Sequence, residues 1–379
     1  MKAGRYARFV DFRHQKWLWT IMDSYLLRKF IGSVFYAIAL LMTVIVVFDI
    51  SQNVQYFEDA TFKQVVFDYY FNFIPYFINL FFPLFTFISV IWFTSKLSER
   101  NEIISFFNGG VSFYRFIVPY IVGAVMLCVF SMLMANFVIP GTNAKLNAFK
   151  DTYFHSKKMR STETITQRNI HFKNSPNSYV YVQFWRKNIN SGDQFTYEIF
   201  GKERMIFKLS AQRISYDSQR NRWHLNNYFI RSFDGDVEHF RSGNQLDTTF
   251  SFTTDDFTRT VQDANILNYR DLKKFIEVEQ AKGSSLVKSY EIEQHRRVAN
   301  PVSIIVMTLL GLCVAARKSQ RGVGVHVFIG MALVFVFIFL QQVSTVFAVS
   351  ESLSPAMAVW LPNLIYFCIC IVMLLTIPK

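Results

Sequence analysis

The sequence is poor in charged residues, because only 18% are Asp, Glu, Lys or Arg, whereas soluble domains contain about 25%. It also has only 4 cysteines and 15 glycines among 379 residues, which excludes a disulfide scaffold and a collagen-like fibre. The hydrophobic share of 51% excludes a disordered chain. These shortages leave a folded protein that is more apolar than a soluble enzyme.

Signatures of nucleotide and metal chemistry are missing as well. No G-x-x-x-x-G-K-[ST] sequence occurs, so we expect no P-loop ATP hydrolysis by this chain. The 7 histidines are scattered and make no H-E-x-x-H pattern, so neither a metal site nor a catalytic residue is predicted. The apolar runs lack paired acids or a nucleophile beside a base, which makes an intramembrane enzyme the weakest hypothesis. No cofactor is expected in this chain.

What the sequence does contain is long apolar runs with almost no charge, such as Phe30–Ile50 and Gly324–Val349. About 20 apolar residues in a helix cross a bilayer. The chain is therefore predicted to be an integral membrane protein, with Cys128, Cys313, Cys368 and Cys370 as small apolar side chains inside its helices. The candidate spans are 30–50, 66–94, 112–138, 299–316, 323–349 and 356–377.

Basic residues beside the spans predict the orientation, because short loops rich in Lys and Arg stay in the cytoplasm. They place both termini in the cytoplasm, and they place the stretch between Pro140 and Pro301 on the outer side, where nucleic acid is not an expected partner. The residues are Lys2, Arg5, Arg8, Arg13, Lys16, Arg28 and Lys29 before the first span, Lys96, Arg100 and Arg115 after the second, and Arg317, Lys318 and Arg321 after the fourth.

The outer stretch is polar, and short alternating apolar runs in it are typical of strands. We expect strands at Ser178–Trp185, Phe195–Phe200, Arg204–Ser215, Arg222–Phe233 and Leu246–Phe257, with turns at 174–177, 190–193, 217–221, 234–236 and 242–244. From these strands we predict a jellyroll-like antiparallel sandwich over about 160–265. The predicted fold is a membrane all-α bundle of six transmembrane helices with an inserted extracytoplasmic all-β domain.

Two helical stretches follow the predicted strands. Asn268–Lys282 has Leu272, Phe275, Ile276 and Val278 on one side and is stopped by Gly283, and the polar stretch Ser289–Arg297 leads into the fourth span. The expected divisions are 1–140 with three spans, 141–297 as the outer domain, and 298–379 with three spans.

The connection between the second and third spans contains a short helix, expected at about 96–109 and ended by Gly109 and Gly110. Apolar residues crowd there beside Glu99 and Glu102. One interpretation is an amphipathic connector resting on lipid headgroups. The other is a coupling helix docked into a cytosolic partner, with Glu102 as its charged contact.

Several sequence patterns together resemble the lipopolysaccharide-export permeases of the LptF/LptG family. They are Phe81–Pro83, Glu99–Ile103, Gly109–Ser112, Tyr290–Pro301, Pro355–Ala356 and Trp360–Asn363. The similarity covers nearly the whole chain and includes six spans and one large domain after the third.

The resemblance implies a subunit of an ATP-driven transporter in the bacterial inner membrane. It implies pairing with a second LptF/LptG-type subunit, docking on a dimer of the ATPase LptB, which would bind ATP and Mg, and transfer of lipopolysaccharide to periplasmic LptC and LptA. By position, Glu102, Glu99, Arg100, Gly109 and Gly110 would couple to the ATPase. A lateral gate for lipid would form between the first span of one subunit and the fifth of the other, including Phe48, Asp49, Phe328 and Phe335.

One departure concerns the lipid phosphates. LptG-type members have basic residues near the outer end of the first span, where this chain has Phe48, Asp49, Val54 and Gln55. The opening Asp23–Leu26 is slightly more LptG-like than LptF-like. The alternative function, from the residues alone, is a membrane-anchored sensor or scaffold whose outer domain binds a ligand without transport.

Overall fold

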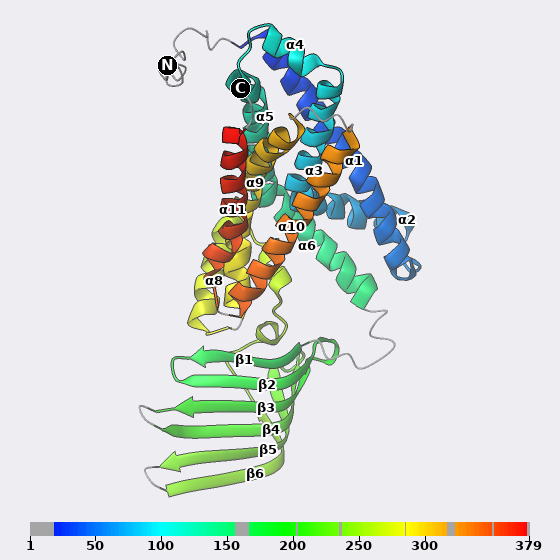
Figure 1. The fold of residues 1–379 in the computed structure, drawn as a ribbon. Coiled ribbons are helices and arrows are strands. Elements are labelled where there is room, and N and C mark those ends of the chain that lie inside the picture. The colour runs from blue at the N-terminus through cyan, green and yellow to red at the C-terminus, as the bar shows by residue number, and fades with distance from the viewer. Residues whose placement is uncertain are drawn as a thin grey trace, which may run out of the picture.

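The computed structural model describes residues 19–155, 167–201, 204–234, 237–284, 286–316, 323–350 and 352–376. The basic residues at 1–18 and Arg317, Lys318 and Arg321, on which the predicted orientation partly depends, lie outside these ranges. In the described part, a helical domain lies at one end of the molecule and a β domain at the other (Figure 1).

The six predicted spans are confirmed, because the described residues include six helices that are long and apolar enough to cross a membrane. Some are single helices, and two are helical runs interrupted by π-helical turns. The spans are α1 (Ile21–Phe57); α2 (Phe62–Gln64) with η1 (Val65–Tyr70) and α3 (Phe71–Glu99); α5 (Phe113–Leu133) with η2 (Met134–Val138), α6 (Ile139–Lys150) and η3 (Asp151–His155); α9 (Val287–Ala315); α10 (Val323–Val349); and α11 (Pro355–Thr376).

Several helices extend beyond the apolar runs that revealed them. Helix α1 begins at Ile21 because the side chains of Thr20 and Asp23 cap each other's backbone N–H groups. The polar stretch at 289–297 and the fourth span form one helix, α9. The predicted fourth span was the shortest apolar run, yet α9 is the most buried of the spans, because it lies in the middle of the bundle.

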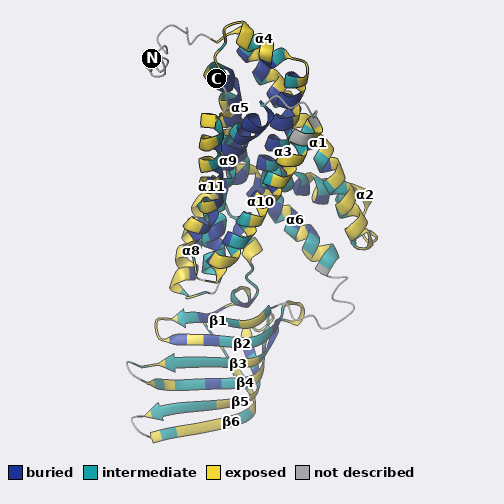
Figure 2. Ribbon diagram, in the orientation of Figure 1, coloured by how far each residue is buried: buried dark blue, intermediate teal, exposed yellow. Residues whose placement is uncertain are grey.

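Buried residues gather on the inner faces of the helices (Figure 2). One cluster joins α1, α3, α5 and α9 through residues such as Phe30, Phe85, Phe116 and Leu312. At Gly123 a Cβ atom would lie 2.6 Å from the ring of Phe30, so α1 and α5 approach closely there. The four cysteines lie in α5, α9 and α11, as predicted, and none of them forms a disulfide; Cys313 and Cys370 are buried, whereas Cys368 is exposed.

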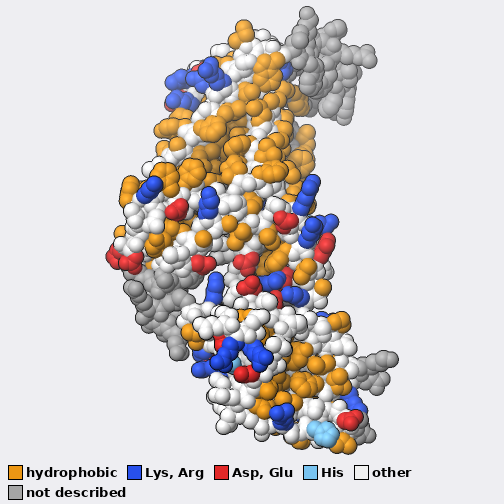
Figure 3. Space-filling view, turned by 180° about the vertical axis from the view of Figure 1, so that it is seen from behind, with side chains coloured by type: hydrophobic (Ala, Val, Ile, Leu, Met, Phe, Trp, Pro, Cys, Tyr) orange, Lys and Arg blue, Asp and Glu red, His pale blue; other side chains and the backbone are white. Residues whose placement is uncertain are grey.

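A broad band of hydrophobic side chains covers the helical domain on the face seen in Figure 3. Charged side chains gather on that face at the end away from the β domain and again where the helices approach the β domain. This distribution matches a helical domain surrounded by lipid, since charges are costly within the hydrocarbon.

The β domain is inserted between the third and fourth spans, as predicted. Its strands run antiparallel in the order β1-β2-β3-β4-β5-β6, each paired with its neighbour in the chain. The described strands therefore form one curved sheet, where we expected the two sheets of a sandwich. The strands are β1 (Gln167–Ser175), β2 (Ser178–Arg186), β3 (Ser191–Phe200), β4 (Met205–Asp217), β5 (Arg222–Asp234) and β6 (Val237–Thr248).

The sequence located the middle strands well and the two edge strands poorly. Strand β1 was not predicted, and the strand expected over Leu246–Phe257 was wrong, because β6 ends at Thr248. The expected turn at 242–244 was wrong too, since Gly243 pairs with Tyr228 inside the β5–β6 ladder. A Cβ atom at Gly243 would lie 2.8 Å from the Tyr228 ring. The glycine is therefore needed to leave space for the Tyr228 side chain, and it does not mark a turn.

One face of the sheet is apolar, and the segment after β6 packs against it. Trp185 and Trp223 from the strands are fully buried with Phe257 of the short helix η5 (Thr254–Phe257). The Trp185 and Phe257 rings stack with centroids 4.5 Å apart. An aromatic core of this kind stabilises the domain without disulfides.

Candidate functional site

The short connecting helix is separated from the spans on both sides. It is α4 (Glu102–Asn108), and the expected helix over 96–109 is divided, because 96–99 form the last turn of α3. Asn101 has φ 58° and Gly110 has φ 84°, two left-handed residues that break the chain before and after α4. The sequence signal for the break was the Gly109–Gly110 pair.

Helix α4 has one face packed on the bundle and one face open. Ile103 is buried in the cluster that holds Leu26 and Phe116, and Phe106 packs against that cluster. Ile104 and Phe107 are each 37% exposed. In Figure 1, α4 lies at the end of the molecule opposite the sheet. We give the name α4 surface to exposed Arg100, Ile104 and Phe107 together with partly exposed Glu102.

Glu102 is held by groups on two sides. The Tyr25 hydroxyl donates a hydrogen bond of 3.1 Å to Oε2 of Glu102. Arg100 approaches Oε1 at 4.0 Å, and the Glu102 side chain is 28% exposed. Glu99 ends α3 and is exposed, and Gly109 caps α4. The predicted coupling residues therefore lie together, while Tyr25 was not predicted because 77 positions separate it from Glu102.

A buried ion pair fixes the starts of α1 and α5 beside α4. Asp23 is fully buried and pairs with Arg115, whose side chain is 13% exposed. Asp23 Oδ2 also accepts hydrogen bonds of 2.7 Å from the backbone N–H and the hydroxyl of Thr20. A buried carboxylate with a charged partner and two further donors holds its position firmly.

The four gate candidates have two different environments. Phe48 on α1 and Phe328 and Phe335 on α10 point outward, with 64%, 74% and 71% of their surface exposed. Asp49 instead accepts hydrogen bonds from the Tyr69 and Tyr70 hydroxyls at 3.2 and 3.1 Å. Its carboxylate is therefore used to join α1 to η1. Helices α1 and α10 are the least buried of the spans.

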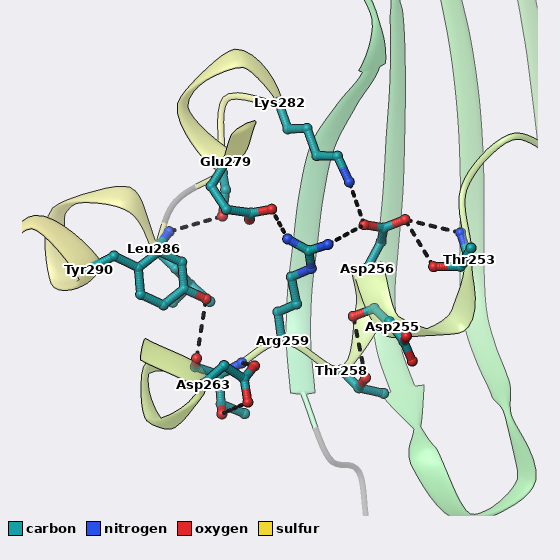
Figure 4. A network of polar contacts seen from close by, with 12 residues as sticks. Thr253, Asp255, Asp256, Thr258, Arg259, Asp263, Glu279, Lys282, Leu286 and Tyr290 are labelled. Carbon is teal, nitrogen blue, oxygen red and sulfur yellow. Dashed lines mark hydrogen bonds and ion pairs between the residues drawn. The ribbon is translucent and has the colours of Figure 1, made fainter. Parts of the chain in front are cut away.

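A charged network joins the β domain to the helical domain (Figure 4). Arg259 follows η5 and pairs with Glu279 of α8 (Tyr269–Ala281) and, at 3.3 Å, with Asp256. Lys282 lies 2.6 Å from the same Asp256 oxygen. Burial alone would raise the pKa of Asp256, but its hydrogen bonds from Lys282 and the Thr253 backbone keep that pKa below its ordinary value.

The network continues through the segment that leads back into the membrane helices. The Tyr290 hydroxyl of α9 donates to the Thr260 carbonyl oxygen at 3.2 Å. Arg297 of α9 donates to the carbonyl oxygens of Ala264 and Leu267 at 2.6 and 2.7 Å, around the short helix η6 (Val261–Ile266). The segment between the β domain and α9 is thus bound to α9 by side-chain hydrogen bonds as well as by the continuous backbone.

The predicted helix over 268–282 is confirmed as α8, capped by Asn268 and followed by Gly283 at φ 63°. Its buried side consists of Leu272, Ile276 and Glu279, while Val278, expected on that side, is 51% exposed. Glu279 falls on the apolar stripe at helical spacing, and an acid at such a position was the available signal for a buried ion pair.

The described residues thus form six helices able to span a membrane, an open short helix at one end and an inserted β domain at the other, the architecture of a multi-pass membrane protein. The sequence profile of the family described as "Lipopolysaccharide export system permease LptF/LptG" matches residues 24–376. The chain belongs to this family, whose members are permease subunits of the inner membrane and not ATPases.

Individual proteins of the same family are also similar to this chain. The LptG permease protein of Haemophilus influenzae is 22% identical over 355 residues, covering 91% of this chain and 95% of that protein. The LptG permease protein of Escherichia coli K12 is 19% identical over 298 residues, or 78% of this chain and 81% of that protein.

Proposed function

We propose that this chain is one of two permease subunits of an ATP-driven lipopolysaccharide exporter. The observation that carries the proposal is the α4 surface, where Glu102 lies beside exposed Ile104 and Phe107 at the end opposite the β domain. In this proposal that end is cytoplasmic, both termini lie there, and the β domain is periplasmic. An ATPase of the LptB type binds the α4 surface as a dimer and hydrolyses ATP with Mg.

Extraction of the lipid from the membrane needs an external source of energy. Exposing acyl chains to water costs on the order of 0.8 kcal/mol per CH₂, so several chains amount to tens of kcal/mol. The sequence has no P-loop motif for ATP hydrolysis. The ATPase must therefore be a separate protein, and its work must reach the lipid through helix movement.

The entry route is assigned to the two least buried spans. A second LptF/LptG-type subunit places its fifth span beside α1 of this chain, and α10 of this chain beside the first span of its partner. Phe48, Phe328 and Phe335 then line an apolar gate, since their side chains point away from the bundle. Asp49 borders the gate and binds the Tyr69 and Tyr70 hydroxyls. Because its negative charge would repel lipid phosphates, the cations that meet those phosphates lie elsewhere in this proposal.

The exit route uses the apolar face of the sheet. Acyl chains pass along this face beside the segment after β6, where Tyr197 of β3 and Phe250 of that segment are only partly buried. The lipid is then handed to periplasmic LptC and LptA. An apolar path is needed throughout, because any aqueous gap would carry the cost described above.

Glu102→Ala tests the proposal. We expect insertion and pairing to persist, while affinity for the ATPase falls roughly 30-fold, equivalent to about 2 kcal/mol for loss of one partner of an interfacial charge pair. Lipopolysaccharide release driven by ATP should fall with it. The measurement is titration of the purified permease pair with the ATPase, followed by ATP hydrolysis.

Glu277→Ala is the matched control, because Glu277 is exposed on α8, at the end of the helical domain next to the β domain and away from α4. It should behave as the unmodified chain. Unchanged binding and hydrolysis in Glu102→Ala would contradict the proposal. A chain that purifies without any nucleotide-dependent partner would favour a membrane-anchored sensor or scaffold instead.

A further inference from the structure

Tyr25 connects the first turns of α1 to the α4 surface through one directed contact. Its hydroxyl donates to Oε2 of Glu102 at 3.1 Å, and Lys29 lies over its ring at 5.7 Å. Tyr25 is 40% exposed. The second carboxylate oxygen of Glu102 lies 4.0 Å from Arg100, whose side chain is 63% exposed.

The backbones on both sides of this contact are fixed. Leu26, next to Tyr25, and Ile103, next to Glu102, are buried in the same apolar cluster. The Asp23–Arg115 pair holds the start of α1 against the start of α5. The Tyr25–Glu102 distance is therefore set by packing, and a shift of α4 must move the beginning of α1 or break the hydrogen bond.

We propose that Tyr25 is a positioning residue for Glu102. It holds Oε2 so that Oε1 is presented to a cationic side chain of the ATPase, and it passes displacement of α4 to α1. The inference rests on the proposed function, because it assigns a role to the contact only if Glu102 binds an ATPase. It adds a direct link between the docking surface and the helix that borders the lipid gate.

A hydrogen bond to one carboxylate oxygen fixes the direction in which the other oxygen meets a cation. Without the tyrosine hydroxyl, Glu102 keeps its charge but can rotate, so docking persists with weaker coupling. We expect Tyr25→Phe to lower lipopolysaccharide released per ATP hydrolysed roughly threefold to tenfold, the range for one hydrogen bond to a charged group that is partly exposed. Removal of the charge in Glu102→Ala would instead lower the affinity for the ATPase itself, by roughly 30-fold.

The experiment uses the complete complex of permease pair and ATPase in nanodiscs containing lipopolysaccharide. Lipid release and phosphate production are measured together for the unmodified chain, Tyr25→Phe and Tyr36→Phe. Tyr36 is a matched control on α1, where its ring stacks on Trp92, so Tyr36→Phe deletes the same hydroxyl and keeps the ring. We expect the ratio to fall only in Tyr25→Phe.

A double-mutant cycle separates positioning from a general defect. Affinity for the ATPase is measured with Tyr25→Phe alone and together with Glu102→Ala. Tyr25→Phe should weaken binding only when Glu102 is present. Equal weakening in both backgrounds, or a release ratio within twofold of the unmodified chain, would overturn the inference. If Glu102→Ala also leaves binding unchanged, the proposed function itself fails.

Discussion

Glu279→Ala is expected to destabilise the junction between the β domain and the helices by about 1.5–3 kcal/mol, because it removes one of the two carboxylates that pair with the partly buried Arg259 and leaves only Asp256. Glu279 is only 2% exposed, so water cannot readily replace the lost charge. We expect faster hydrogen exchange and proteolysis over η6 and α8. Binding of the ATPase at the α4 surface should persist, since α4 lies at the other end of the molecule.

Glu277→Ala provides the comparison on the same helix, two positions away and exposed. Both changes remove one negative charge and one carboxylate, and only Glu279 belongs to the network of Figure 4. If the two variants show the same exchange and proteolysis as the unmodified chain, the network does not hold the β domain in place.

Asp23→Ala is expected to have a similarly large effect at the opposite end. It takes this carboxylate away from the mostly buried Arg115 and removes the Asp23 half of the capping box of α1, for a combined cost of about 3 kcal/mol or more. The melting temperature of the purified permease pair should fall by several degrees. ATPase binding should weaken although Glu102 is intact, because α4 packs on the displaced helix starts.

Asp68→Ala is a suitable control, because Asp68 is an exposed acid in η1. It should leave both the melting temperature and ATPase binding unchanged. A variant Asp23→Ala with normal stability and normal binding would show that the ion pair with Arg115 has no part in supporting α4.

Membrane helices were predictable because the hydrocarbon requires long apolar runs, and an almost uncharged run such as 30–50 is longer than the apolar stretches of most soluble helices. The ends of the helices were less predictable. Arg28 and Lys29 lie inside α1 although they looked like its flank. Helix α9 combines a polar half and an apolar half, and only packing inside the bundle shows that the two are continuous.

The edge strands were hard to predict for a related reason. Strand β1 has few apolar residues, and most side chains of β6 are exposed, so neither shows the alternation of a half-buried strand. Inner strands β4 and β5 pair on both sides and carry that alternation. A single sheet cannot be distinguished from two sheets by alternation alone, because each strand buries one face in both cases.

The α4 segment was recognisable from its acids, its apolar residues and the glycine pair that follows, all within a short stretch of the chain. Contacts between distant segments had no such signal. Tyr25 and Glu102 are 77 positions apart, and Arg259 and Glu279 are joined only after α8 packs beside η5. These contacts depend on tertiary structure, which local patterns do not encode.

The central claim is that lipopolysaccharide passes over the apolar face of the β domain when a docked ATPase hydrolyses ATP. A photocrosslinking residue at Phe250, which packs on that face, tests this directly. The same residue at Phe240 is the control, since Phe240 is 61% exposed and contacts Phe229 on the other face. We predict lipid adducts at position 250 that require ATP and the ATPase, and few at 240. Equal adducts at both positions, or adducts that form without ATP, would contradict the account.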